Sequence, residues 1–301
     1  MSAPALVSIA DPNQRPHAAL DPAARLALLR ERIAHLGRVI VAYSGGVDSS
    51  VVLAVAHEQL GAGALGVIGR SDSYARRELE LALQQAASLG ASVEIVTTGE
   101  LANPGFASNP TDRCYHCKSE LYRQLDAVAG RFGANAILDG TILDDLSDHR
   151  PGRKAAEEHA VRSPLAELGF TKADVRAAAA ALGLASRDKP ASPCLASRIP
   201  YGTGITRENL AMIEQAEEAL RALGFAELRV RHHGDVARIE VPIADLERLI
   251  REPLRERVVA AVRSAGYRFV SLDLEGFRSG SLNRAPGSSR AISGTAYQAH
   301  R

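Results

Sequence analysis

Short apolar runs alternate with longer amphipathic stretches through the first part of the chain. Some of these runs are brief and almost wholly apolar, which predicts buried strands at residues 39–42, 65–68, 93–96 and 136–138. Helices are predicted from Asp21 and Pro22, an N-cap followed by a first-turn proline, then after residue 50 and over residues 73–89. Strands that alternate with helices predict an α/β fold, with a parallel sheet covered by helices on both faces.

The pattern changes near residue 200, where Pro200, Gly202 and Gly204 mark a connector. A small α+β domain is predicted beyond it, from a helix at 209–223, strands at 228–231 and 237–241, a helical region at 242–265 and a last strand at 269–274. We therefore divide the chain into a disordered tail (1–20), a large α/β domain (21–200), a small substrate or oligomerisation domain (201–283) and a second disordered tail (284–301).

The composition narrows the classes of function. The 301-residue chain has a net charge of +1, which gives no long-range electrostatic attraction for nucleic acid. With 4% aromatic residues, it also offers no base-stacking surface. No apolar run approaches the roughly 20 residues of a membrane helix, and the N-terminus lacks a signal-peptide pattern. We expect a cytoplasmic protein without a membrane partner. Three cysteines, two of them in Cys-x-x-Cys, favour metal or redox chemistry over structural disulfides.

A glycine-rich turn joins the first predicted strand to the next helix. It comprises Ser44, Gly45, Gly46, Val47, Asp48, Ser49 and Ser50. Adjacent glycines let successive N–H groups point at one spot, and a helix N-terminus adds donors, so the turn can hold a phosphate or pyrophosphate. It matches neither the Walker nor the dinucleotide pattern. Ser-Gly-Gly-x-Asp-Ser instead resembles the PP-loop of the ATP pyrophosphatases, which split ATP into AMP and pyrophosphate. A strand-to-helix turn without a ligand is the alternative.

The cysteines form a second candidate site. Cys114 and Cys117 can converge on one metal or on one another, and Cys194 follows Lys189, whose positive charge favours a thiolate. Three cysteines cannot complete a Cys₄ zinc site, but they can hold three irons of a [4Fe–4S] cluster and leave the fourth open to an exogenous ligand. A Cys₃His site with His116 is an alternative, and so are thiols that are merely half-buried.

Further candidates lie at the carboxyl edge of the predicted sheet. Residues 139–152, which include Gly140, directly follow the last strand of this sheet. Their carboxylates, with Asp144 among them, could hold Mg²⁺ beside the phosphates, and Arg150 could meet a phosphate or a substrate carboxylate. A solvated acidic loop is the alternative. Ser71 either lines the adenine or ribose pocket or caps the next helix.

The small domain offers a weaker pattern. Arg229 and Arg231 alternate on one face of a predicted strand, and Glu240 lies on its neighbour, so these residues could form a phosphate or metal site. Exposed charges on an amphipathic strand are the alternative. Glu217, on the preceding helix, is weaker evidence still.

Together these segments resemble the LarE-type ATP-dependent sulfurtransferases of nickel-pincer cofactor synthesis. The resemblance covers about residues 22–283 and is carried by residues 44–50, 109–118, 139–152, 194–202 and 273–280. The PP-loop assigns only the superfamily. The segment around Cys194 and the Gly-Phe-Arg-Ser-Gly run near the C-terminus are specific to the family. The chain departs from the family at Ile142, because an asparagine commonly follows Asp-Gly-Thr, and any nucleotide contact from that amide would be missing.

The resemblance implies a reaction. A carboxylate of pyridinium-3,5-biscarboxylic acid mononucleotide is adenylated by ATP, sulfur displaces AMP, and the step is repeated at the second carboxylate. In single-cysteine members the residue matching Cys194 surrenders its own sulfur. Members with three cysteines are expected to use a [4Fe–4S] cluster that carries a labile sulfide, supplied as sulfide or by a cysteine desulfurase. Because this chain has Cys114 and Cys117 as well, we favour the cluster.

The resemblance also implies binding roles outside the cysteines. Arg229 and Arg231 would bind the substrate phosphate, Glu217 and Glu240 would belong to a nearby metal or phosphate site, and Arg198 would join the cofactor-binding set. Asp48 and Asp144 are the candidate Mg²⁺ ligands. The family further implies a homo-oligomer, either trimer-based or hexameric.

Other classes of function remain as alternatives. A tRNA thiolase is the nearest, since some thiolases pair a PP-loop with Cys-x-x-Cys and a further cysteine, but no RNA-binding domain is recognisable. An ATP-dependent amidating synthetase would leave the cysteines without a role. A non-enzymatic ATP-sensing module would leave the thiols idle.

Overall fold

The computed structural model describes residues 20–146 and 151–278. Arg150 and the predicted tails, apart from Leu20, lie outside the described residues. The chain divides into two compact units, Met1–Cys194 and Leu195–Arg301, and the sequence-based boundary at residue 200 falls a few residues further along. Each unit has a hydrophobic core of its own.

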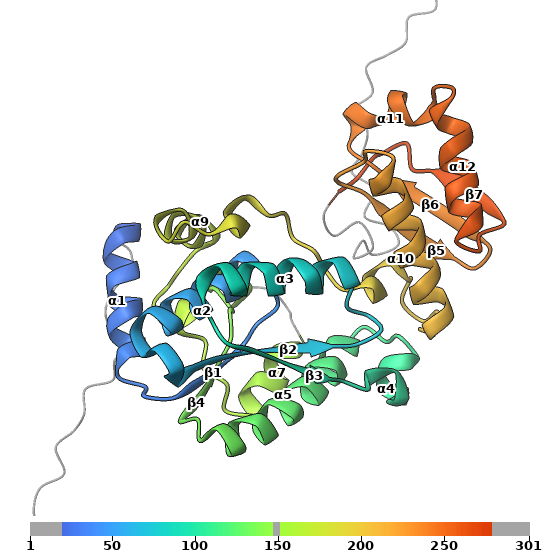
Figure 1. Cartoon of the computed structure of the whole chain (residues 1–301). Coiled ribbons are helices and arrows are strands. Elements are labelled where there is room, and N and C mark those ends of the chain that lie inside the picture. Colours follow the sequence, from blue (N-terminus) through green and yellow to red (C-terminus); the bar gives the residue numbers. More distant parts are fainter. Residues whose placement is uncertain (1–19, 147–150, 279–301) are drawn as a thin grey trace, which may run out of the picture. The chain divides into compact units, whose positions relative to one another are not determined.

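A parallel sheet organises the first unit (Figure 1). Its strands have the order β3-β2-β1-β4 and comprise β1 (Val39–Ala42), β2 (Ala64–Arg70), β3 (Val93–Thr97) and β4 (Ala136–Leu138). In the register, Ile40 of β1 lies opposite Leu65 of β2 and Ile137 of β4. These strands confirm the predicted ones. Because β1 and β4 are neighbours, the segments that follow them leave the same edge of the sheet side by side.

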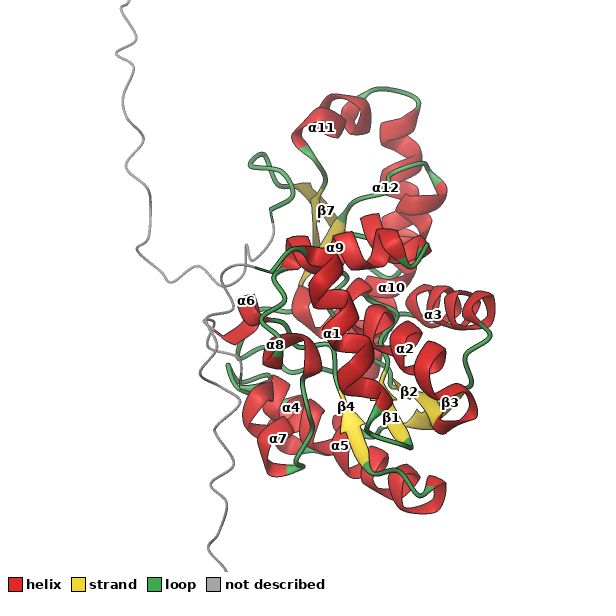
Figure 2. Ribbon diagram, turned by 90° about the vertical axis from the view of Figure 1, so that its left-hand side faces the viewer, coloured by secondary structure: helices red, strands yellow, loops and turns green. Residues whose placement is uncertain are grey.

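Helices cover both faces of this sheet, as the alternating pattern predicts (Figures 1 and 2). One face packs against α1 (Pro22–Ala34), α2 (Val47–Leu60), α3 (Arg76–Leu89) and α9 (Lys172–Ala181). The other face packs against α5 (Arg113–Phe132) and α7 (Gly152–Glu158). Alternate residues of β1 serve the two cores, since Val39 and Val41 belong to the first and Ile40 to the second. The predicted N-cap is confirmed, because the Asp21 carboxylate accepts a hydrogen bond from the Ala24 N–H at 2.7 Å.

Three of these helices, α5, α7 and α9, were not predicted. In α5, Tyr122, Leu125 and Val128 recur at helical spacing on the buried face, but long polar side chains fill the rest of the helix. The first unit also contains short helical turns: η3 (Gly61–Gly63), η4 (Glu100–Ala102), α4 (Pro104–Ala107), α6 (Leu143–Leu146), α8 (Pro164–Glu167) and η5 (Ala185–Asp188). Several of these connect the sheet edge to the longer helices.

The second unit is a small α+β fold. Its elements are η6 (Leu195–Arg198), α10 (Arg207–Ala222), β5 (Arg229–His233), β6 (Val236–Glu240), α11 (Ile243–Ile250), α12 (Leu254–Ser264) and β7 (Phe269–Leu272). The strand order is β5-β6-β7, with β5 antiparallel and β7 parallel to β6. The helical region predicted over 242–265 is two helices, because Pro253 cannot continue a helix that begins before it. Among residues 20–146 and 151–278, no helix has both the length and the apolar character that crossing a membrane requires.

Candidate active site

The glycine-rich turn lies between β1 and α2, at the carboxyl end of the strand. Gly45 has a φ of +66°, and a Cβ there would lie 2.5 Å from the Cβ of Ala82 on α3, so no other residue fits. Gly46 is the N-cap of α2, whose first residue is the buried Val47. This places the N-terminus of a long helix directly behind the turn, with the unpaired N–H groups that favour an anion.

Hydrogen bonds that involve serine and tyrosine hydroxyl groups hold the backbone of the turn in place. The Ser49 hydroxyl accepts from the Ser44 N–H at 3.2 Å and donates to the Gly46 carbonyl at 3.1 Å. The Ser50 hydroxyl donates to the same carbonyl at 2.7 Å. Tyr74, which precedes α3, donates from its phenol to the Ser44 carbonyl at 2.9 Å. The shape of the turn is therefore fixed before any ligand arrives.

The segment after β4 packs tightly on this turn. A Cβ at Gly140 would lie 2.6 Å from the Ser49 nitrogen, so the two backbones touch. The carboxylate of Asp139 is buried and accepts hydrogen bonds from the Thr141 N–H and hydroxyl, the Ser163 hydroxyl and the Tyr122 phenol. These donors hold the segment in place.

Ile142 also belongs to this segment, and its side chain is buried in the core of the first unit. The residue that departs from the family pattern therefore packs as an apolar side chain.

A lysine that the sequence analysis missed binds the aspartate of the turn. The Lys172 ammonium, at the start of α9, lies 2.8 Å from both carboxylate oxygens of Asp48. The Lys172 N–H also donates to the Asp144 carboxylate at 2.8 Å. Both candidate Mg²⁺ ligands thus contact one residue. The Thr171–Asp174 capping box signals a helix start here, but nothing local links it to Asp48, which lies far away in sequence.

Ser71 does not cap the following helix, since the N-cap of α3 is Ala75. Its hydroxyl accepts from the Ser73 N–H at 3.3 Å and lies 3.0 Å from the Ser73 hydroxyl. Ser73 in turn donates to the buried carboxylate of Glu100 at 2.8 Å, and Thr98 donates to the other oxygen at 2.8 Å. Glu100 is a buried acid that no sequence pattern indicated.

Cys114 and Cys117 lie in the first two turns of α5, and Cys194 is the last residue of the first unit. Cys114 is exposed, the other two are half-buried, and none of the three forms a disulfide. Burial raises the pKa of Cys117, the charges of Glu100 and Cys194 raise it further, and Lys118 opposes them. Cys117 therefore interacts electrostatically with both of the other cysteines.

The geometry around these thiols is not that of a single-metal site. Within residues 20–146 and 151–278, no three His, Cys, Asp or Glu side chains converge as ligands of one metal ion. The His116 ring packs on α4, where a Cβ at Gly105 would lie 2.5 Å from the ring.

Lys189, which is expected to act on Cys194, contacts the glycine-rich turn. Its ammonium donates to the Gly45 carbonyl at 3.1 Å and pairs with Glu78 of α3 at 2.8 Å. Arg198, in the second unit, forms two hydrogen bonds of 2.9 and 3.0 Å to Glu217.

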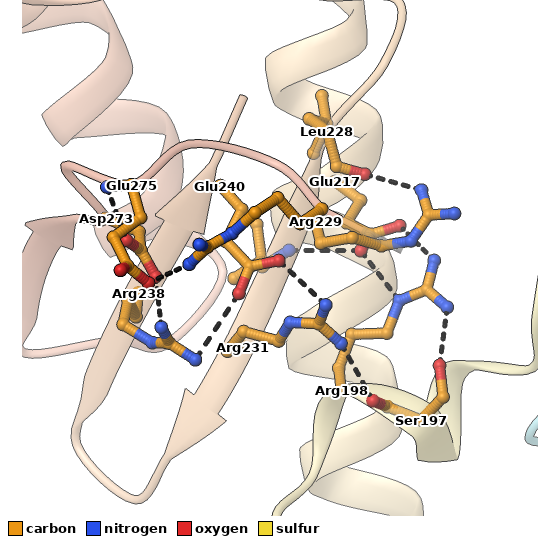
Figure 3. A network of polar contacts seen from close by, with 12 residues as sticks. Ser197, Arg198, Glu217, Leu228, Arg229, Arg231, Arg238, Glu240, Asp273 and Glu275 are labelled. Carbon is orange, nitrogen blue, oxygen red and sulfur yellow. Dashed lines mark hydrogen bonds and ion pairs between the residues drawn. The ribbon is translucent and has the colours of Figure 1, made fainter. Parts of the chain in front are cut away.

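The second unit holds an arginine–glutamate cluster (Figure 3). We define it as Arg198, Glu217, Arg221, Arg229, Arg231, Arg238 and Glu240. Two arginines contact each glutamate: Arg198 and Arg221 bind Glu217, while Arg231 and Arg238 bind Glu240. Glu217 and Glu240 are 1% and 0% exposed. The alternative of exposed charges on an amphipathic strand is therefore wrong for Arg229, Arg231 and Glu240, all of which are buried.

This cluster carries more guanidinium groups than carboxylates. Burial lowers the pKa of Arg229 to about 10, and the nearby charge of Arg198 lowers it further, against the opposing effect of Glu217. Arg229 donates to the Leu228 carbonyl at 2.7 Å and lies over the Phe277 ring. Arg198 and its neighbours hold the pKa of Glu217 below its usual range, although burial alone would raise it. Crowded buried cations of this kind favour an added anion.

The fold and the turn define a protein of the PP-loop class, and comparison with known proteins identifies the family. The chain is 45% identical over 260 residues to an uncharacterised protein of Synechocystis sp., covering 86% of this chain and 97% of the relative. It is 42% identical over 262 residues to the pyridinium-3,5-bisthiocarboxylic acid mononucleotide synthase of Lactiplantibacillus plantarum, covering 87% and 94%. The chain belongs to this synthase family, LarE.

The chain is also similar to a more distant protein. The chain is 28% identical over 200 residues to a glutamine-hydrolysing GMP synthase of Aeropyrum pernix, covering 60% of this chain and 39% of the relative. No family model matches the chain.

Proposed function

We propose that the protein is an ATP-dependent sulfurtransferase that converts the carboxylates of pyridinium-3,5-biscarboxylic acid mononucleotide into thiocarboxylates. The observation that carries the proposal is the 42% identity, over most of both chains, to a synthase whose name specifies the thiocarboxylate product. The glycine-rich turn and the three thiols all lie within one unit and would supply the two chemistries that such a reaction needs.

The first step is adenylation. The turn from Ser44 to Ser50 binds the β- and γ-phosphates through its N–H groups, and a substrate carboxylate oxygen attacks the α-phosphorus. The α–β phosphoanhydride bond breaks, pyrophosphate leaves, and an acyl-adenylate forms. The oxygen donors of Asp48 and Asp144 fit Mg²⁺, and Asp48 already accepts a cation, the Lys172 ammonium. Bound Mg²⁺ would offset the phosphate charge.

The second step is sulfur delivery, and Cys114, Cys117 and Cys194 would carry it. Three cysteine thiols are a donor set that suits a [4Fe–4S] cluster with one open iron, and Cys117 interacts electrostatically with the other two. Such a cluster would supply a labile sulfide, delivered as sulfide or by a cysteine desulfurase. The competing route, loss of the sulfur of Cys194 itself, needs neither Cys114 nor Cys117.

The arginine–glutamate cluster supports binding of the phosphate of a mononucleotide. Arg229 and Arg231 are buried among other cations, so a phosphate would relieve their mutual repulsion. Glu217 and Glu240 each engage two arginines and orient them. We therefore assign these glutamates to support of an anion site. We also extend the homo-oligomeric assembly of the family to this protein.

Exchange of pyrophosphate into ATP tests the substrate class. We expect exchange with the pyridinium dicarboxylate mononucleotide and none with tRNA. Exchange driven by tRNA alone would establish a tRNA thiolase, and exchange followed by ammonia incorporation would establish an amidating synthetase. Binding of ATP without any exchange would leave only a sensing module.

Iron and sulfide assays on anaerobically reconstituted protein test the sulfur route, with Cys114→Ser and Cys117→Ser as controls. About four irons per chain are expected for the cluster. An iron-free active protein whose Cys194 loses the mass of H₂S on turnover would establish the sacrificial route.

A further inference from the structure

Lys189 connects the glycine-rich turn to the segment that ends at Cys194. Its ammonium contacts the Gly45 carbonyl at 3.1 Å and the Glu78 carboxylate at 2.8 Å, and both side chains of this ion pair are 18% exposed. Gly45 belongs to the turn proposed to hold ATP. The contact is therefore a partly buried, charged hydrogen bond to the backbone of the ATP loop.

The backbone of Lys189 begins the segment that ends at Cys194. Residues 189–194 form neither helix nor strand, and residues 190–193 are exposed. Pro190 and Pro193 restrict the φ angles of the segment. Even fully extended, five residues span at most about 17 Å. Anchoring Lys189 on Gly45 therefore limits how far the Cys194 sulfur can move from the ATP loop.

We propose that Lys189 is a positioning residue that couples adenylation to sulfur delivery. The proposal rests on the proposed function and concerns the fate of the acyl-adenylate. In the productive branch, the sulfur of HS⁻ bonds to the acyl carbon, the bond from that carbon to the AMP oxygen breaks, and the proton passes to solvent as the thiocarboxylate forms. In the wasteful branch, water supplies the oxygen, AMP leaves, and the carboxylate is regenerated. The Lys189 anchor favours the first branch by keeping the sulfur site beside the loop.

The other contacts to the turn do not have this property. Lys172 reaches Asp48 from the start of α9, and Tyr74 reaches the Ser44 carbonyl from the segment before α3. Neither is followed by a segment that ends at a cysteine. Phosphate bound in the turn would bring negative charge close to the ammonium and would help to keep Lys189 at the loop.

The test is Lys189→Met, assayed with the full-length reconstituted protein, ATP, the pyridinium dicarboxylate mononucleotide and sulfide. Pyrophosphate exchange is expected to stay within about threefold of wild type. Thiocarboxylate formed per AMP released is expected to fall by about 10²-fold, the loss typical of a 1 Å misplacement of a reacting group. Lys189→Arg, which keeps the charge, should recover most of the coupling.

Arg187→Gln is the matched control, because Arg187 lies two residues away, is 59% exposed and pairs with its neighbour Asp188. It should behave as wild type. Glu78→Gln keeps the lysine but removes its carboxylate partner, so it should uncouple more weakly, and the double variant should be no worse than Lys189→Met.

The outcomes separate two failures. A wild-type protein without substrate-dependent exchange would refute the proposed function and the coupling with it. If wild type is active but exchange and thiocarboxylate formation fall in parallel in Lys189→Met and in Glu78→Gln, the residue serves adenylation and the coupling is refuted alone. An unchanged ratio of thiocarboxylate to AMP in both variants refutes it equally.

Discussion

The contact between Gly140 and the glycine-rich turn allows a quantitative test of the ATP site. A Cβ at this position would lie 2.6 Å from the Ser49 nitrogen and 2.9 Å from the carbonyl carbon of Asp48, and ordinary contacts begin at 3.4 Å. In Gly140→Ala one of the two backbones must therefore move by about 0.8 Å. Neither partner is a flexible side chain, so the shift falls on the turn or on the segment after β4.

Two magnitudes follow from that shift. Overpacking of this kind costs about 1–3 kcal/mol of unfolding free energy, which lowers Tm by roughly 2–4 °C per kcal/mol for a chain of this size. Displacement of the phosphate-binding N–H groups by nearly 1 Å should lower pyrophosphate exchange by about 10²-fold. Thermal unfolding followed by circular dichroism gives the first quantity, and isotope exchange at saturating ATP gives the second.

Gly130→Ala is the matched control for this experiment. Gly130 lies within α5, and a Cβ there meets nothing within 4 Å. Replacing an interior helical glycine by alanine should raise stability by up to about 1 kcal/mol and leave exchange unchanged. If Gly140→Ala matches wild type in both assays, the close approach of the two backbones does not determine the shape of the ATP loop, and the reasoning is wrong.

Three further predictions concern the thiol site and the ion pairs. Cys194→Ala should abolish thiocarboxylate formation but preserve pyrophosphate exchange, because the turn is intact; loss of both activities would assign a structural role to the thiol. Glu217→Gln should cost about 3–5 kcal/mol in chemical denaturation, because it leaves Arg198 buried without its carboxylate. Arg198 and its neighbours lower the pKa of Glu217. The contribution of the ionised Glu217 to the free energy of unfolding is therefore present above the unfolded pKa of about 4.3 and lost as the pH falls through the folded pKa. A wild-type protein whose stability falls no faster on acidification than that of Glu217→Gln would contradict the pairing. Lys172→Met should cost about 1 kcal/mol or less, because its pair with Asp48 has side chains 42% and 27% exposed; a loss equal to that of Glu217→Gln would show that burial does not set the difference.

Local patterns predicted the elements that local forces determine. The strands from β1 to β4 are apolar runs, and the turn depends on two adjacent glycines, Gly45 and Gly46. Asp21 caps α1 through a contact three residues away. The helices missed on the two faces of the sheet were α5, α7 and α9. In α5 the cysteines directed attention to metal chemistry, although the buried spacing of Tyr122, Leu125 and Val128 is helical.

The contacts of the candidate site were less predictable, because they join residues distant in sequence. Lys172 binds Asp48 and Lys189 binds Gly45 across more than a hundred residues of sequence, because the fold brings the start of α9 and the end of η5 to the glycine-rich turn. The burial of Arg229, Arg231 and Glu240 was underestimated for a related reason. Charged residues alternating on a strand indicate solvent unless partners from other elements are known, and Arg198 and Glu217 come from η6 and α10.

The alignment of β5 and β6 gives the arginine–glutamate cluster a consequence for folding. In this hairpin Arg229 lies opposite Glu240 and Arg231 opposite Arg238, while Val230 and Ile239 face the apolar core. A slip by one residue would exchange the two faces and bury the charges in that core. A slip by two residues that sets Arg229 opposite Arg238 would move Glu240 away from Arg231 and break their ion pair. The ion pairs thus select one alignment among those the chain could sample, so variants of Glu240 should misalign the hairpin during refolding as well as weaken the folded state.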